Sequence, residues 1–377
     1  MEWVKLGDVA EISSGGTPRR SNVDYWKNGD IPWIKISDMK SKYVSETEEF
    51  ITESGLKNSS AKLFKQGTII YTIFATIGEI AILDIDATTN QAIAGITLID
   101  NRINKEYIYY YLLSMKEQMK GIARGVAQKN LNLSILKDVS IPLLDIQKQK
   151  ELVSYFKINE SLISTRKAQI VALDELVQSL FYEMFGDVDD SKFATDIFEN
   201  LTIVNQGLQI AQSKRYKEYV DNSYEYITIQ YLNGKKDREY VVPKSENVIC
   251  NKEDILVTRT GNTGQIVTGV EGVFHNNFFK VNYNKALLLK EYLYYFLNLK
   301  TTQSRIKLLA GTSTIPDLNH GDFYSIEIPL PPLELQEQFA AKVEAIETQK
   351  AKLQASLQEM ETLFNALMQE AFSGNLG

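Results

Sequence analysis

Cysteine and histidine are nearly absent from these 377 residues, since Cys250, His275 and His320 are the only ones. One cysteine excludes an internal disulfide and a thiolate metal cluster, and two histidines exclude a multi-histidine metal site. No run of about 18 apolar residues is present, and the sequence does not begin with a basic segment followed by an apolar stretch. We therefore expect a cytoplasmic protein with no metal site and no membrane association.

The motifs of several common catalytic chemistries are missing as well. There is no G-x-x-x-x-G-K-[ST] phosphate loop and no dinucleotide-type G-x-G-x-x-G. Pro331-Pro332 is flanked by leucines, so the Asn/Asp-Pro-Pro-aromatic string of amino-methyltransferases is absent. Pro316-Asp317 with Glu327 is similar to a nuclease motif, but Pro329 stands where its lysine would be. We expect no catalytic residue in this chain.

What is present is a repeat at half the chain length. Ile141–Leu143 recurs as Ile328–Leu330, 187 residues later, and six such matches occur in one order at offsets from 185 to 189. This pattern predicts a tandem duplication rather than a short-period solenoid. The matches include Glu106–Leu112 with Glu291–Leu297 at 185, Asn90-Gln91 with Asn276-Asn277 at 186, and Leu144–Gln149 with Leu333–Gln338 at 189 after an apparent two-residue insertion.

Each half has two parts of different composition. Residues 1–143 and 187–332 contain nearly all the glycines, aromatics and alternating β-branched runs, which is typical of β-rich globular domains. Residues 144–186 and 333–377 carry an apolar heptad pattern and lack glycine until their ends. We predict an α+β protein in which two β-rich domains are joined by two long helices that form an antiparallel coiled coil, with an internal pseudo-twofold repeat.

The apolar residues of both helical segments alternate at spacings of four and three over more than four heptads, which favours a coiled coil. Gln, Lys and Glu occupy most other positions, so each helix has one narrow apolar stripe and needs a long partner. Two core helices in separate domains are the alternative. Asn159, Arg166 and Lys350 interrupt the seam, and such residues can set register. The predicted seam consists of Leu152, Phe156, Ile163, Ile170, Leu173, Val177, Leu180, Phe339, Val343, Ile346, Leu353, Leu357, Met360, Phe364 and Leu367.

The combination resembles the specificity (S) subunit of type I restriction-modification systems, over essentially the whole chain. The resemblance rests on the duplication, the twin helices and several short strings in order. These strings are Val4–Val9, Ser14–Pro18, Tyr25-Trp26, Gly29–Ile34 and Asp254–Gly261, with Ile-Pro-Leu before both helices.

The resemblance implies a noncatalytic subunit with two target recognition domains, 1–143 and 187–332, each reading half of a split site in double-stranded DNA. It implies that the spacer helices, 144–186 and 333–377, act as a ruler and dock two methyltransferase (M) subunits, through which restriction (R) subunits join. S-adenosylmethionine, ATP and Mg would belong to those partners, and this chain would hold no cofactor.

The net charge of −7 argues against DNA binding until it is divided by region. Residues 1–143 hold 17 basic and 17 acidic groups, and residues 187–332 hold 16 and 18. Residues 333–377 hold 3 and 7, so the second helical segment supplies −4 of the −7. The two recognition domains are near neutral, which is compatible with local basic patches.

Candidate DNA contacts are basic and amide side chains near turns. Arg suits guanine or phosphate, and Asn or Gln suits adenine. Solvated surface residues and, for Asn90 and Asn276, turn capping are the alternatives. The candidates are Arg19, Arg20, Lys27, Lys35, Asn90, Gln91, Arg124, Lys129, Lys214, Arg215, Tyr216, Lys217, Lys235, Lys236, Arg238, Arg259, His275, Asn276 and Asn277.

The competing function is a coiled-coil scaffold whose two β-rich heads bind proteins or glycans.

Overall fold

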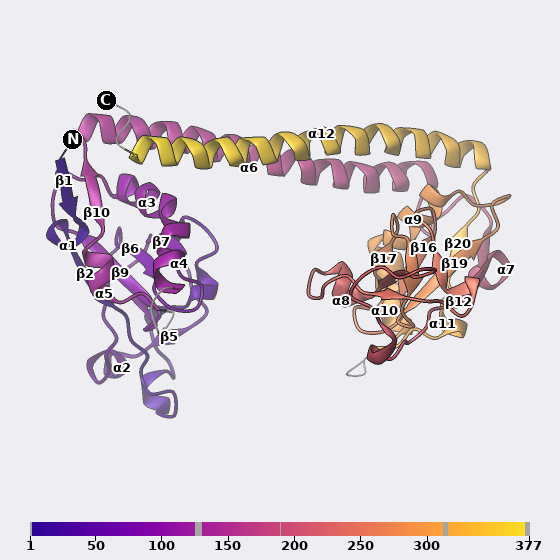
Figure 1. Ribbon diagram of the computed structural model, residues 1–377, viewed down its shortest axis with the longest axis horizontal. Helices are drawn as coiled ribbons and strands as arrows, with labels where there is room; N and C mark the ends of the chain where they lie inside the picture. Colours follow the sequence, from indigo (N-terminus) through magenta and orange to yellow (C-terminus); the bar gives the residue numbers. More distant parts are fainter. Residues whose placement is uncertain (1, 125–129, 189, 312–315, 374–377) are drawn as a thin grey trace. The chain divides into compact units, whose positions relative to one another are not determined.

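The structure is a computed structural model that describes residues 2–124, 130–188, 190–311 and 316–373. The chain divides into two compact units, unit 1 (residues 1–167 and 355–377) and unit 2 (residues 168–354). Each unit holds a globular head of helices and strands and a part of both long helices, α6 (Ile146–Phe185) and α12 (Leu333–Phe372) (Figure 1). Within the described ranges, no helix is both long and apolar enough to cross a membrane.

The head of unit 1 is built on a five-stranded sheet of order β2-β9-β6-β7-β4, whose central strands β6 and β7 are fully buried. Such strands favour the isoleucines and other apolar residues found in them. Two smaller sheets, β5-β3-β8 and β1-β10, complete the head. The strands are β1 (Glu2–Lys5), β2 (Ala10–Ser14), β3 (Ile31–Ile34), β4 (Tyr43–Val44), β5 (Phe50–Ile51), β6 (Ile69–Thr72), β7 (Ile80–Leu83), β8 (Thr88–Thr89), β9 (Ile93–Leu98) and β10 (Ser140–Leu143). The helices are α1 (Leu6–Val9), α2 (Glu53–Lys57), α3 (Lys105–Ser114), α4 (Lys116–Arg124) and α5 (Leu133–Lys137).

The head of unit 2 repeats most of this topology, but among its described strands none corresponds to β4. Sheet β12-β19-β16-β17 corresponds to β2-β9-β6-β7, and β11-β20 corresponds to β1-β10. The parallel pair β13 and β18 corresponds to the parallel pair β3 and β8. The strands are β11 (Thr195–Ile197), β12 (Thr202–Gln206), β13 (Tyr224–Ile227), β14 (Tyr240–Val241), β15 (Ile249–Cys250), β16 (Ile255–Thr258), β17 (Ile266–Val267), β18 (Gly272–Phe274), β19 (Phe278–Tyr283) and β20 (Glu327–Pro329). The helices are α7 (Phe198–Leu201), α8 (Ile229–Leu232), α9 (Lys290–Asn298), α10 (Lys300–Leu309) and α11 (His320–Tyr324). The predicted internal repeat is confirmed.

The two long helices run antiparallel, as predicted. In unit 1 the early part of α6 meets the late part of α12, where the rings of Phe156 and Phe364 lie 6.0 Å apart. In unit 2 the late part of α6 meets the early part of α12, where the rings of Phe181 and Phe339 lie 5.5 Å apart. Each helix has 40 residues without Gly or Pro, which permits an uninterrupted helix of about 60 Å.

Burial along the helices follows the predicted seam except near the end of each helix. Near the end of α6, Phe181 and Phe185 are buried although neither was a predicted seam residue, and Leu180 is only half-buried. Leu367 is 37% exposed, whereas the next residue, Met368, is 3% exposed. Here α12 leaves the two-helix seam and packs into the core of unit 1 through Met368, Ala371 and Phe372, which turns the buried face by one residue. The seam prediction at Leu367 is therefore wrong. Of the other predicted seam residues, Phe156, Val177, Phe339, Val343 and Phe364 are buried and Leu152, Ile163, Ile170, Leu173, Leu180, Ile346, Leu353, Leu357 and Met360 are half-buried.

Two fully buried glutamines fasten the long helices to the heads. Gln149 accepts a hydrogen bond from the backbone N–H of Asn104 (2.8 Å) and donates to the carbonyls of Arg102 (2.9 Å) and Leu144 (2.8 Å). Gln336 accepts from the N–H of Leu289 (2.8 Å) and donates to the carbonyls of Leu287 (2.8 Å) and Pro331 (2.9 Å). Each amide thus joins the start of a long helix to the segment that begins α3 or α9.

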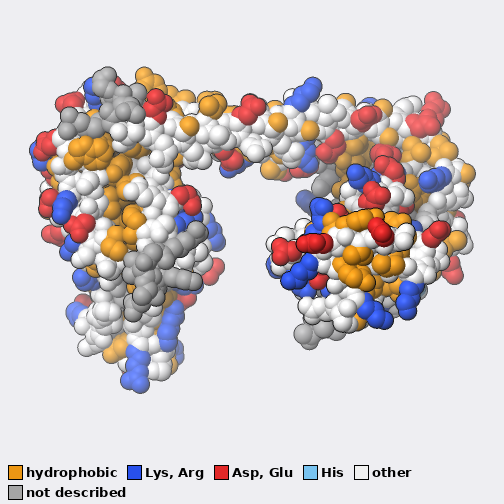
Figure 2. Space-filling view, in the orientation of Figure 1, with side chains coloured by type: hydrophobic (Ala, Val, Ile, Leu, Met, Phe, Trp, Pro, Cys, Tyr) orange, Lys and Arg blue, Asp and Glu red, His pale blue; other side chains and the backbone are white. Residues whose placement is uncertain are grey.

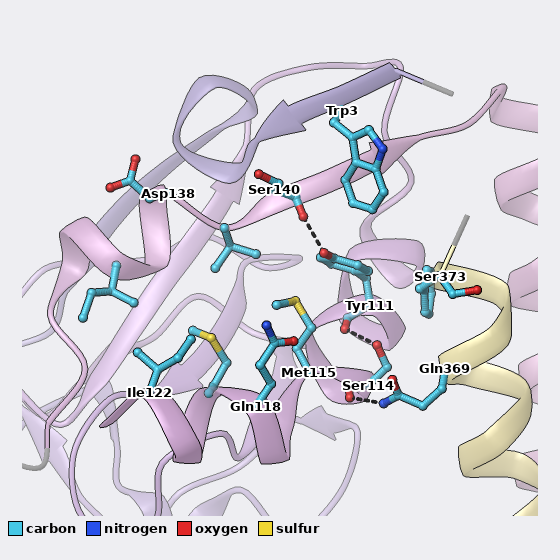
Figure 3. Close-up of a pocket in the computed structure, with 14 residues that line it drawn as sticks. Trp3, Tyr111, Ser114, Met115, Gln118, Ile122, Asp138, Ser140, Gln369 and Ser373 are labelled. Carbon is cyan, nitrogen blue, oxygen red and sulfur yellow. Dashed lines mark hydrogen bonds between the residues drawn. The ribbon is translucent and has the colours of Figure 1, made fainter. Parts of the chain in front are cut away.

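The end of α12 is also attached to the head of unit 1, as Figure 3 shows. The Gln369 side chain donates to the carbonyl of Ser114 at the end of α3 (2.5 Å), and Tyr111 donates to the carbonyl of Ser140 on β10. These residues border a groove of about 630 Å³ that also contains Trp3 and Met115. None of the lining residues described there is Lys or Arg, so this groove does not suit a phosphate backbone.

Candidate nucleic-acid interface

In unit 1 the loop that carries Arg19 and Arg20 is held by two close-packed glycines. A Cβ on Gly15 would lie 2.0 Å from Thr89 Oγ1, and one on Gly16 would lie 2.3 Å from the carbonyl carbon of Ser60. The backbone N–H groups of both glycines donate to strand carbonyls, those of Ile93 and Thr89. Glycine is required because the backbones approach too closely for any side chain. The start of the loop that carries Arg19 and Arg20 is therefore held in a fixed position against the strands of the head.

The two arginines of this loop have different surroundings. The Arg20 guanidinium lies 3.7 Å from the ring centre of Trp26 and 4.6 Å from that of Trp33, and it pairs with Glu49. Glu49 also pairs with Lys35 (2.7 Å), and its pKa is lowered chiefly by the hydrogen bond from Arg20. Arg19 is exposed, and no described residue pairs with its side chain. Arg19 is therefore the arginine available to a ligand.

The other candidates of unit 1 also differ in availability. Lys27 is exposed, and its amine has no ion-pair partner within the described ranges. Asn90 Oδ1 accepts from the N–H of Ala92 (3.0 Å), which is the turn-capping alternative, and Gln91 accepts from the Thr17 hydroxyl. Arg124 is the last residue of α4, and Lys129 lies outside the described residues.

In unit 2 the basic string 214–217 contains one arginine that the fold uses internally. Arg215 pairs with Glu239 (3.0 Å), donates to the Ile210 carbonyl and lies 4.9 Å from the ring centre of Tyr226. Lys214, Tyr216 and Lys217 are exposed, and no described residue forms an ion pair with either lysine.

In the second basic string, 235–238, the arginine is again paired within the fold and the lysines are not. Lys235 and Lys236 are exposed and have no ion-pair partner among the described residues, whereas Arg238 pairs with Glu225 (3.0 Å). Arg259 forms a two-pronged pair with Asp317, with nitrogen–oxygen distances of 2.7 and 2.8 Å. Among the candidates, Arg20, Arg215, Arg238 and Arg259 hold loops through ion pairs, whereas Arg19, Lys27, Lys214, Lys217, Lys235 and Lys236 have no ion-pair partner among the described residues.

The turn around His275 shows that one predicted repeat match is displaced by a residue. His275 Nδ1 accepts from the N–H of Asn277 (3.1 Å), and the His275 N–H donates to Ile227 at the end of β13. In unit 1, Asn90 makes the corresponding bonds, to Ala92 and to Ile34 at the end of β3. Asn90 therefore corresponds to His275, at an offset of 185, and not to Asn276.

The surroundings of His275 and Asn276 are partly buried. Burial lowers the pKa of His275, helped by the nearby Arg215, against the raising effect of its bond to Asn277. The His275 and Tyr226 rings lie 5.7 Å apart, so Tyr226 joins two candidates that are 60 residues apart in sequence, Arg215 and His275. Asn276 Oδ1 is buried and has no hydrogen-bond partner among the described residues.

Of the exposed tyrosines in this region, Tyr216 was among the predicted contacts, but Tyr219 and Tyr224 were not. Tyr219 is 64% exposed and borders a groove of about 790 Å³ with Tyr224, Tyr231 and Tyr240. Figure 2 shows apolar side chains gathered on one face of unit 2, with both basic and acidic side chains around them. The signal in the sequence was the series of tyrosines at 216, 219 and 224 in a polar segment. By contrast, Tyr107–Tyr111 is buried in the core of unit 1.

Comparison with known proteins identifies both halves. A family model described as the type I restriction modification DNA specificity domain matches residues 1–173 and again residues 192–362. The type I restriction enzyme MjaIX specificity subunit of Methanocaldococcus jannaschii is 24% identical, over 99% of this chain and 92% of that protein. The EcoR124I/EcoR124II specificity subunit of Escherichia coli is 28% identical, over 50% of this chain and 48% of that protein.

A solved structure concerned with complex assembly and conformational transition of the type I R-M system has a similar fold. It matches with a TM-score of 0.65 at 17% identity and covers 100% of this chain and 98% of its own. With the family model matching nearly all of both halves, this chain belongs to the type I restriction-modification DNA specificity family.

Proposed function

We propose that this chain is the DNA sequence-specificity subunit of a type I restriction-modification enzyme. Each head, residues 1–143 and 187–332, would read one half of a split site in double-stranded DNA. The spacer helices, 144–186 and 333–377, would set the distance between the half-sites. The observation that carries the proposal is that both copies of one fold, in a chain of this family, present free basic side chains, Arg19 and Lys27 in unit 1 and Lys214, Lys217, Lys235 and Lys236 in unit 2.

The chemistry would reside in partner subunits. Two methyltransferase subunits would dock on this chain and supply S-adenosylmethionine-dependent adenine methylation, and restriction subunits would supply ATP- and Mg-dependent cleavage. This chain would contribute no catalytic residue, metal ligand or cofactor site. Its share of the affinity would come from phosphate contacts by lysines, and its share of the specificity from a few arginine, amide and aromatic contacts to bases.

The test is to co-express the chain with the methyltransferase encoded beside it and to map methylated adenines across the host genome. A single bipartite motif is expected. Exchanging residues 187–332 for the corresponding domain of another specificity subunit should change one half of the motif only. No motif in the presence of a stable complex, or a motif altered in both halves by the exchange, would contradict the proposal.

The helices allow a second test of spacing. Seven residues added to α6 alone, after Lys167, should abolish methylation, because α6 and α12 are fastened to the heads and pair antiparallel. Seven residues added to both helices should restore a motif with the same half-sites and a longer spacer, since a heptad adds about 10 Å of helix. An unchanged spacer would exclude the ruler role.

A further inference from the structure

A lysine in unit 1 is enclosed by four residues of α3 and α6. Lys42 lies just before β4, and its Nζ donates to the Tyr110 hydroxyl (2.6 Å) and to Glu160 (3.3 Å). Its amine lies 4.1 Å from the ring centre of Tyr110, 4.9 Å from that of Tyr109 and 3.9 Å from a carboxylate oxygen of Glu106. Two aromatic rings and two carboxylates thus hold one ammonium group, whose side chain is only 15% exposed.

The same residues, two glutamates and two tyrosines, stand at the four corresponding positions of unit 2. Glu106, Tyr109 and Tyr110 of α3 correspond to Glu291, Tyr294 and Tyr295 of α9, at an offset of 185. Glu160 of α6 corresponds to Glu347 of α12, at the offset of 187 that relates the two buried glutamines. Tyr295 donates to Glu347 (3.1 Å) as Tyr110 donates to Glu160 (2.6 Å). The cage of Lys42 is therefore rebuilt in unit 2.

In unit 2 this cage is open. Its four residues line a groove of about 690 Å³, with Ala340, Ala341 and Val343 among the apolar residues beside them. Within the part of the chain that the structure describes, no Lys or Arg lies over the ring of Tyr294 or Tyr295. Lys290 borders the groove but pairs with Glu253 (2.7 Å). Lys350 pairs with Asp174 and lies 3.9 Å from Glu347, the distance at which Lys42 lies from Glu106, so Glu347 has a cation beside it.

The surroundings of the open cage are more acidic than those of the filled one. Lys150 and Lys157 of α6 correspond to Glu337 and Glu344 of α12, and both glutamates line the groove. In unit 1, Lys157 pairs with Glu106 (2.7 Å). In unit 2, none of the described residues forms an ion pair with Glu291, Glu337 or Glu344. The groove has the aromatic walls that hold an ammonium group, and three of its four glutamates, Glu291, Glu337 and Glu344, have no ion-pair partner among the described residues.

We propose that this groove, between α9 and α12, receives a lysine side chain from a basic segment of a protein partner, held as Lys42 is held in unit 1. Lysine fits because the filled copy holds a lysine, and flanking basic residues would meet Glu337 and Glu344. The inference rests on the proposed function, in which that partner is a methyltransferase subunit. It specifies where on this chain and through which chemistry the partner docks.

The first test reverses the rim charges in the full-length chain. The double variant Glu337→Lys with Glu344→Lys should weaken binding to the purified methyltransferase subunit by roughly 30-fold or more, measured by isothermal titration calorimetry. The matched control is Glu359→Lys with Glu370→Lys, which makes the same charge change on exposed positions of α12 outside the groove. An unfolding temperature equal to that of the wild type would show that both double variants fold. Undiminished binding of the rim variant, or equal weakening by the control, would overturn the proposal.

The second test locates the lysine directly. A zero-length carbodiimide cross-linker joins a carboxylate to an amine in contact with it, and mass spectrometry identifies the pair. We expect Glu337 or Glu344 joined to a lysine of the methyltransferase subunit. Cross-links from these glutamates only to lysines of this chain or of a second copy, or no cross-link from them, would overturn the proposal.

Different experimental results would overturn the proposed function and the docking groove. A bipartite methylation motif together with normal binding by the rim variant would leave the proposed function standing and overturn the docking groove. A wild-type chain that forms no complex with the methyltransferase would overturn both.

Discussion

Gln149 and Gln336, 187 residues apart, make the same three hydrogen bonds in the two halves of the chain. This equivalence corrects the alignment of the repeat, because matching Leu144–Gln149 with Leu333–Gln338 placed Gln149 opposite Gln338. Gln338 is exposed, and the two long helices correspond without an insertion. The hydrogen bonds of a buried amide therefore align the two halves more reliably than a short stretch of similar sequence does.

Replacing Gln336 with leucine should destabilise unit 2. The buried carbonyls of Leu287 and Pro331 and the N–H of Leu289 would lose their partners, at a cost of roughly 3 kcal/mol in the free energy of unfolding. Urea denaturation followed by circular dichroism measures the change. Gln338→Leu, on the same helix but exposed, is the control and should change stability by less than ~0.5 kcal/mol. Equal effects of the two variants would contradict the role of the buried amide.

Replacing Lys42 with methionine should destabilise unit 1 by about 2 kcal/mol. The change leaves Glu160 and the Tyr110 hydroxyl without the ammonium group that they now share, and Glu106 with Lys157 as its remaining ion-pair partner. Differential scanning calorimetry checks the shift in unfolding temperature. Lys40→Met, an exposed lysine two residues away, should leave it unchanged. A Lys42 variant as stable as wild type would show that the cage contributes no net stability.

Arg19 and Arg20 should differ in what their loss affects. Arg19→Ala should lower the affinity for the methylation target and reduce the slope of log K against log salt by about 1, if it contacts a phosphate, with no change in stability. Arg20→Ala should lower the stability of unit 1 by ~1 kcal/mol, because Arg20 is held by Trp26, Trp33 and Glu49. Fluorescence anisotropy with labelled DNA and thermal unfolding separate the two effects. The assignment fails if Arg19→Ala binds DNA like wild type.

His275 should make the stability of unit 2 fall in mild acid. Its pKa is lowered in the folded state, chiefly by burial, so the unfolded chain binds a proton more readily. Stability is therefore complete above the ordinary value of 6.5 and decreases as pH falls through and below it. Protonation of Nδ1 would also break the hydrogen bond that it accepts from the N–H of Asn277. Unfolding temperatures measured between pH 7.5 and pH 5 should fall more for wild type than for His275→Asn, and parallel curves would exclude this role.

The repeat, the class of fold and the antiparallel helix pair could be predicted from the sequence because each depends on a period along the chain. A heptad pattern free of Gly and Pro predicts one uninterrupted helix, and two copies of it predict a long pair. The error at Leu367 arose where that period stops governing burial, because the core of unit 1 captures the end of α12 through Met368 and Phe372.

For the candidate DNA interface, the sequence predicted only which loops contain basic and amide residues. Nothing in the order of residues distinguishes Arg19, which is free, from Arg20, which lies against two tryptophans and Glu49. Arg259 and Asp317 are 58 residues apart, and Arg215 and His275 approach one ring from different loops. Whether a charge is free to meet a ligand depends on non-local pairing, which only the folded chain decides. The sequence by itself determined the duplication and its helices, and the tertiary structure decided which basic groups remain free and that one lysine cage is filled while its copy stays open.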